Sequence, residues 1–178
     1  MKLISRLLLV ILLAVAALAA QDQRAAVSPK AAERIQREVR HQLVMLPRLS
    51  VFDNLAYKVD GYNVTLLGQV SEPITKSDAE NAVKRIEGVE KVDNQIEVLP
   101  PSPMDDRLRL RLYRAIYGYP PLQKYALPVI KPIRIIVKGG HVTLEGVVDN
   151  EGDKKVAGIR AHGVSGSFSV TNNLVVAK

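Results

Sequence analysis

Arginine side chains that recur at helical spacing are the residues with the clearest chemistry in this sequence. Three of them stand at i, i+4 and i+7, on one face of a predicted helix: Arg107, Arg111 and Arg114. A looser group occurs earlier in the chain: Arg34, Arg37 and Arg40. Such rows of guanidinium groups can bind anionic phospholipid headgroups, and each charge near the surface contributes about 1 kcal/mol. The alternative is a solvated face, with Asp105 and Asp106 neutralising part of the charge at Arg109.

Three tyrosines lie in a proline-rich segment between residues 117 and 132: Tyr117, Tyr119 and Tyr125. This composition predicts an irregular loop with two possible uses. The tyrosines can form a clasp over the core of their own domain, with buried rings and solvated hydroxyls. They can also form a recognition surface for an envelope protein or the cell wall. We expect the clasp, which is the commoner use of a loop tyrosine.

The other polar residues do not predict a catalytic or metal site. The three histidines, His41, His141 and His162, show no metal-ligand spacing. Residues 163–167 fall one residue short of a nucleophile elbow and have no triad partners. We therefore expect a non-enzymatic protein without a metal or other cofactor. Binding of a small ion would need converging carbonyls or carboxylates that the sequence does not reveal.

Two asparagines are predicted on the apolar side of their strands. Asn94 and Asn172 occupy matching places near the ends of two similar segments. A buried amide needs hydrogen-bond partners, so each side chain must fix a neighbouring loop or contact a ligand. We expect loop fixing, because both copies contain the residue and a ligand site would need further convergent polar groups.

These residues are positioned by a module that the chain contains twice. Residues 64–70 (VTLLGQV) reappear 78 positions later as residues 142–148 (VTLEGVV), and residues 92–98 match 170–176 at the same offset. The first of these segments follows a glycine turn and an alternating apolar run in both copies, as is typical of a β-hairpin. An offset preserved across two separate stretches indicates a duplicated module. Because this period is too long for a solenoid unit, each copy should close its own core.

Hydrophobic periodicity predicts the elements of the first copy: a helix at 30–46, strands at 55–59 and 64–70, a helix at 73–87 and a strand at 92–98. The second helix can begin at Pro73 or at a capping box formed by Ser77 and Glu80. The second copy repeats this order, with three residues fewer in its second helix if Gly88 corresponds to Gly163.

The predicted fold class is therefore α+β, with two repeated αββαβ modules, each a three-stranded sheet covered by two helices. The predicted domains are residues 30–99 and 104–177, joined by a proline linker at 100–103.

The first 20 residues predict a cleaved secretory signal peptide. Lys2 and Arg6 precede an apolar stretch at 7–20, which is shorter than the roughly 20 residues that span a membrane and ends in small residues. We expect a periplasmic or secreted protein with no transmembrane segment after cleavage. Loss of these two charges lowers the net charge from +7 to +5, which favours anionic surfaces. Export excludes nucleic acid as a partner, and the absence of cysteine excludes disulfides.

The order of the elements and the repeated motifs resemble the BON domain. The motifs are a glycine turn, Val-Thr-Leu-x-Gly-x-Val, and a closing Gly-Val followed by Val-x-Asn-x-Ile/Leu, over residues 30–99 and 104–177. Tandem copies behind a signal peptide are similar to the osmotically inducible periplasmic proteins of bacteria. The resemblance implies a non-enzymatic envelope protein that contacts phospholipid membranes, other envelope components or, in some relatives, small ions.

The lead hypothesis is reversible binding to anionic phospholipid, by charge and not by insertion, in support of envelope integrity or stress tolerance. The alternative hypothesis is a protein- or cell-wall-binding adaptor in the periplasm.

Overall fold

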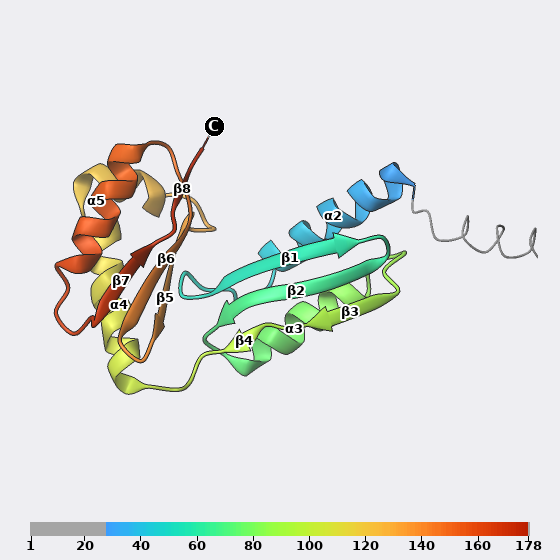
Figure 1. The fold of residues 1–178 in the computed structure, drawn as a ribbon, viewed down its shortest axis with the longest axis horizontal. Coiled ribbons are helices and arrows are strands. Elements are labelled where there is room, and N and C mark those ends of the chain that lie inside the picture. Colours follow the sequence, from blue (N-terminus) through green and yellow to red (C-terminus); the bar gives the residue numbers. More distant parts are fainter. Residues whose placement is uncertain (1–27, 178) are drawn as a thin grey trace, which may run out of the picture.

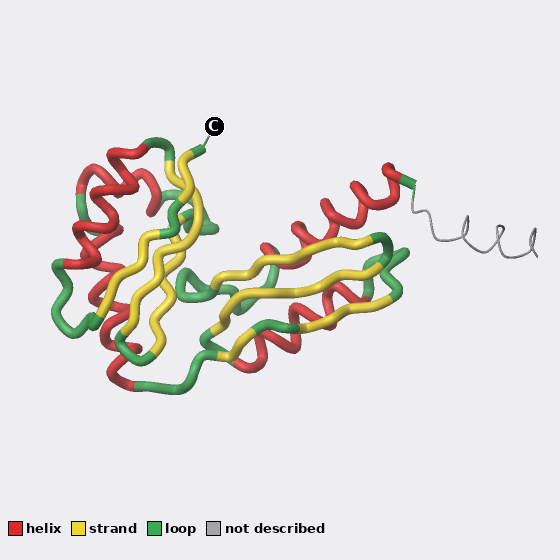
Figure 2. The backbone as a smooth tube through the Cα atoms, viewed as in Figure 1, coloured by secondary structure: helices red, strands yellow, loops and turns green. Residues whose placement is uncertain are grey.

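The computed structural model describes residues 28–177, which form two modules with the same order of elements (Figures 1 and 2). Module 1 comprises α2 (Pro29–Val44), β1 (Asn54–Asp60), β2 (Asn63–Val70), α3 (Pro73–Lys84), β3 (Lys91–Asn94) and β4 (Glu97–Val98). Module 2 comprises α4 (Pro103–Tyr117), the 3-10 helix η2 (Pro120–Ala126), β5 (Ile133–Lys138), β6 (His141–Val148), α5 (Glu151–His162), β7 (Ser169–Asn172) and β8 (Val175–Val176). The predicted signal peptide, residues 1–20, lies outside the described residues.

The central strand of each sheet pairs antiparallel with the strand before it and parallel with the strand after it. In module 1, β2 lies between β1 and the pair β3 and β4, and in module 2 β6 lies between β5 and the pair β7 and β8. Parallel neighbours need a crossover connection, and α3 and α5 provide it. The predicted α+β fold of two repeated αββαβ modules is therefore confirmed.

Each module buries one face of its sheet beneath two helices. The apolar stripe of α2, Ile35, Val39 and Leu43, packs against strand residues such as Leu66 and Ile96. Module 2 has the equivalent core, formed by Leu108, Leu112 and Ile116 of α4 and by strand residues such as Leu144 and Leu174. Because the apolar stripe of each helix faces the sheet, most of its polar side chains lie on the outer surface of the module. Asp105 and Arg109 of α4 are buried exceptions.

The last strand of each module is interrupted, so the prediction of one continuous strand over 92–98 was wrong. In module 1, Asn94 Oδ1 accepts the N–H of Ile96 at 3.2 Å, while Asn94 Nδ2 donates to the Lys76 carbonyl on α3 at 3.0 Å. Asn172 repeats both contacts in module 2, with the Lys154 carbonyl at 2.8 Å and the N–H of Leu174 at 3.3 Å. The asparagines thus hold the break in the strand against the crossover helix, as the loop-fixing interpretation requires.

The predicted shortening of the second helix in module 2 was also wrong. Helices α3 and α5 each contain 12 residues, and the offset of 78 is constant from the first residue of these helices to the last strand. Gly88 corresponds to Gly166, with φ of 85° and 93°, and not to Gly163. Pro73 occupies the first turn of α3, so the alternative start at Ser77 is excluded.

The two modules dock through the loop between α2 and β1. The Val51 carbonyl accepts the N–H of Ile135, on the outer edge of β5, at 2.9 Å, and the Ser50 carbonyl accepts from Arg134 Nη1 at 2.8 Å. The ring of Phe52 lies edge-on to Tyr113 of α4, with 6.5 Å between ring centroids. The loop therefore covers a strand edge that would otherwise be unpaired.

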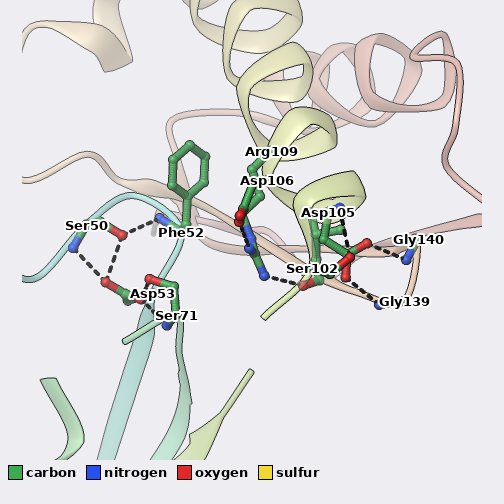
Figure 3. Close-up of polar contacts among 11 residues, drawn as sticks. Ser50, Phe52, Asp53, Ser71, Ser102, Asp105, Asp106, Arg109, Gly139 and Gly140 are labelled. Atoms are coloured by element: carbon green, nitrogen blue, oxygen red, sulfur yellow. Dashed lines mark hydrogen bonds and ion pairs between the residues drawn. The ribbon is translucent and has the colours of Figure 1, made fainter. Parts of the chain in front are cut away.

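The carboxylate of Asp53 fixes this docking loop (Figure 3). Its Oδ2 accepts from the N–H and hydroxyl of Ser50 at 2.8 and 2.7 Å, and its Oδ1 accepts from the N–H and hydroxyl of Ser71 at 2.6 and 2.8 Å. Four donors satisfy a carboxylate that is almost fully buried. They tie the loop to the end of β2, so that Phe52 is held in position toward module 2.

The glycine of the repeated Val-Thr-Leu-x-Gly motif has a backbone conformation and a close neighbour that exclude a side chain. Gly68 has φ of 110°, and a Cβ atom there would overlap the carbonyl of Asn54, whereas a Cβ atom at Gly139, with φ of 57°, would meet nothing within 4 Å. We predict that Gly68→Ala lowers the free energy of unfolding by about 3 to 5 kcal/mol, because backbone strain and steric overlap add. Gly139→Ala should cost about 1 kcal/mol. Urea denaturation of both variants checks this, and equal losses would contradict it.

Candidate functional site

Helix α4 carries the three arginines predicted to form a binding face. Ser102 caps the helix by accepting the N–H of Asp105 at 3.2 Å, and Pro103 occupies the first turn. With the apolar stripe of α4 facing the sheet, the arginines are exposed on the opposite side: Arg107, Arg111 and Arg114. In Figure 1, α4 and α5 lie on the side of their sheet that faces away from module 1. This surface is therefore not covered by the docked module.

Helix α5 adds two cations to the same helical layer. Lys155 and Arg160 are exposed, and Arg160 Nε donates to the Ala115 carbonyl of α4 at 3.1 Å. The guanidinium of Arg160 also lies over the ring of Tyr119, 4.8 Å from its centroid. We call these five residues the cationic face: Arg107, Arg111, Arg114, Lys155 and Arg160.

Few acidic groups oppose the cationic face. Among residues 28–177, none of its five members forms an ion pair within 4.0 Å. Asp106 pairs with Arg109, Asp153 pairs with Lys124, and Asp105 is buried. Glu151, at the first turn of α5, is the remaining acid on the two helices. The face thus presents a concentrated positive field to any anionic surface.

The arginines of α2 lie on module 1 and do not join the cationic face. Arg34 is half-buried and donates to the Glu87 carbonyl at 2.9 Å, so its guanidinium closes the turn after α3. Arg37 and Arg40 are exposed, but Glu33 and Glu38 of the same helix are exposed among them. The helical layer of module 1 therefore has mixed charge, and the structure separates the two predicted arginine groups.

Asp105 has a role that the sequence did not suggest. It was expected to neutralise Arg109, but its carboxylate instead accepts the N–H groups of Gly139 and Gly140 at 2.8 and 2.9 Å (Figure 3). Arg109 is also buried, and it binds Asp106 Oδ1 at 2.5 Å and the Val137 carbonyl at 2.7 Å. The first turn of α4 is thus tied to the turn between β5 and β6. The paired glycines of this turn were the signal in the sequence, because they offer two adjacent N–H groups with no side chain in the way.

Two of the three candidate tyrosines lie in the core of module 2. Tyr117 is buried and donates its hydroxyl to the Ile133 carbonyl at 2.5 Å, and burial raises the pKa of this hydroxyl. Tyr125 is also buried, donates to Asp153 Oδ2 at 2.6 Å and accepts the N–H of Asp149 at 2.8 Å. Tyr119 is half-buried beneath Arg160. The buried rings are those of a clasp, but the hydroxyls of Tyr117 and Tyr125 bond to protein groups, so the expectation of solvated hydroxyls was wrong. Of the three tyrosines, Tyr119 is best placed to meet a partner.

The histidines make local contacts on different elements. His141 Nδ1 lies 2.8 Å from the Ser169 hydroxyl, and His162 Nδ1 lies 2.9 Å from the Gly158 carbonyl. His41 is exposed in the last turn of α2. Over residues 28–177, no group of three or more histidine, cysteine or acidic side chains is arranged to hold a metal ion. No helix in this part of the chain is long and apolar enough to cross a membrane.

The clasp predicts an acid-sensitive contribution to stability. Lys124, whose Nζ lies 2.7 Å from Asp153 Oδ2, and the Tyr125 hydroxyl hold the pKa of Asp153 below its usual value. The unfolded chain therefore binds the proton first, with a pKa of about 3.9, and stability is lost as pH falls through the lower pKa of the folded state. Thermal unfolding between pH 6 and 2 should show a steeper loss for the wild type than for Asp153→Asn. Lys124→Met should also flatten the profile, and parallel curves for all three proteins would contradict this assignment.

Comparison with known proteins identifies the repeated module. The structure of CdsD, a structural protein of the type III secretion system of Chlamydia trachomatis, is 14% identical over 82% of this chain and 94% of its own, with a TM-score of 0.29. A structure of the CdsD C-terminal domain is 12% identical over 80% of this chain and 96% of its own, with a TM-score of 0.28. No curated protein sequence matches the chain. The family model of the BON domain matches residues 31–100 and 122–178, so the chain belongs to the BON domain family.

Proposed function

We propose that this protein is a non-enzymatic envelope protein that binds anionic phospholipid surfaces through the cationic face of module 2. BON domains are in general binding modules that associate with phospholipid membranes. The observation that supports the choice of module 2 is the concentration of five exposed cations on α4 and α5 with little opposing charge. In module 1, acidic residues are interspersed among the arginines of α2.

The expected strength of binding follows from the number of charges. Each cation close to an anionic membrane contributes about 1 kcal/mol, so five give an attraction on the order of 5 kcal/mol before the loss of freedom on binding is counted. This is enough for reversible binding and too weak to resist salt, since the field decays within about 10 Å at 0.1 M salt. Such reversible binding in the periplasm, or outside the cell, would suit a role in envelope integrity or stress tolerance.

Co-sedimentation with vesicles tests the proposal. The protein should pellet with vesicles containing phosphatidylglycerol, should not pellet with pure phosphatidylcholine, and should be released by 0.5 M salt. Reversal of Arg107, Arg111 and Arg114 to Glu should weaken binding at least about 100-fold, because three attractions become repulsions.

A control triple variant on α2, with Lys30, Arg37 and Arg40 changed to Glu, has the same change in net charge but should retain most of the binding. Circular dichroism of both variants checks that they fold. Equal losses in the two variants would contradict assignment of the site to module 2. Absence of pelleting at low salt would favour the adaptor hypothesis, in which the exposed edge of Tyr119 contacts a protein or the cell wall.

A further inference from the structure

Two large apolar side chains are exposed together at one end of module 2, beside the cationic face. Phe168 is 78% exposed and Met104 is 71% exposed. We propose that these two side chains, which we call the apolar tip, enter the boundary between headgroups and acyl chains when module 2 binds an anionic membrane. This inference rests on the proposed function and goes beyond it, because binding then has a part that is due to insertion and not to charge.

The backbone around the apolar tip is held in place by hydrogen bonds. Met104 is adjacent to Asp105, whose carboxylate binds the N–H groups of Gly139 and Gly140. The N–H of Phe168 donates to the Gly140 carbonyl at 2.8 Å, and the Phe168 ring lies so close to Gly140 that an added Cβ atom would be 2.7 Å from Phe168 Cδ2. The first turn of α4, the β5–β6 turn and the start of β7 are thus joined at one point. Phe168 remains exposed although its backbone is fixed, so its exposure does not result from a loose loop.

The cationic face reaches the apolar tip. An added Cβ atom at Gly166, two residues before Phe168, would lie 2.9 Å from Arg111 Nη2, so the guanidinium of Arg111 rests on this loop. Arg107 is one helical turn from Met104 and is exposed like it. A cation next to an exposed apolar side chain matches the interface of a bilayer, where anionic headgroups lie directly above hydrocarbon.

Module 1 has the same backbone at this place but different side chains. Glu90 corresponds to Phe168, and its N–H donates to the Tyr62 carbonyl at 2.9 Å, as that of Phe168 does to Gly140. The fold therefore does not need an aromatic ring at this position, because module 1 places a charged and exposed side chain there. The Phe168 ring contacts Gly140 and the ring of His141, with 6.0 Å between ring centroids, but these contacts leave it 78% exposed. A membrane partner would explain this exposure.

A lipid surface fits the apolar tip better than a protein partner does. Stable protein interfaces bury about 800 Å² on each side, and two side chains beside Arg107 and Arg111 cannot supply such an apolar core. A bilayer has no such area requirement, since it accepts single side chains at a depth set by the charges around them.

Tryptophan fluorescence tests the inference without interference, because the chain contains no tryptophan. In the full-length protein, Phe168→Trp should shift its emission to shorter wavelength on addition of phosphatidylglycerol vesicles, and lipids brominated on the acyl chains should quench it at least two-fold. The matched control, Glu90→Trp in module 1, should show neither change. A second variant, Met104→Ser with Phe168→Ser, should pellet with vesicles at least five-fold more weakly than the wild type at 0.3 M salt, where charge is largely screened.

The outcomes separate the inference from the proposed function. If Phe168→Trp pellets with vesicles but its emission does not shift, binding is by charge alone and the inference is overturned while the proposed function stands. If the wild type does not pellet, both fail. A shift that grows with protein concentration in the absence of vesicles would show that the apolar tip binds a second copy of the chain, which also overturns the inference.

Discussion

The carboxylate of Asp105 is the contact on which the arrangement of the candidate site depends. A buried charge is costly unless donors surround it, and here the N–H groups of Gly139 and Gly140 supply them. Because Asp105 belongs to the first turn of α4, these bonds fix the helix against the β5–β6 turn and set which way its outer side points. Arg107, and Arg111 one turn further on, then face outward beside Phe168. The equivalent end of module 1 is closed differently, by Arg34 on the Glu87 carbonyl.

The two modules thus share one fold but differ in the side chains of their outer surfaces. Both modules keep the interrupted last strand, the asparagine that supports it and the glycine of the hairpin, because each of these serves the backbone. The helical layers have diverged, since their outer side chains do not affect the core. Docking through Val51 and Phe52 covers the edge of β5 and leaves α4 and α5 on the far side of module 2 (Figure 1). Under the proposed function, module 1 supports module 2, and module 2 is the part that meets the membrane.

The fold could be predicted from the sequence because it depends on local periodicity and on a repeated motif. Alternation of apolar residues correctly predicted the hairpins. The prediction that Asn94 fixes a loop is also confirmed. Gly88 and Gly163 each precede a valine, so the sequence alone aligns them wrongly. The positive φ shared by Gly88 and Gly166 identifies Gly166 as the true counterpart. Asp105 and the docking of Phe52 could not be predicted, since both depend on contacts between residues more than 30 positions apart that no local pattern records.

Hydrogen exchange of the full-length protein, with and without phosphatidylglycerol vesicles, tests most directly whether module 2, and not module 1, binds the membrane. The account predicts slower amide exchange on binding in residues 103–117 and 163–168 of module 2, and unchanged exchange in residues 29–44 of module 1. Protection confined to α2, or spread equally over both helical layers, would contradict the assignment of the membrane surface to module 2.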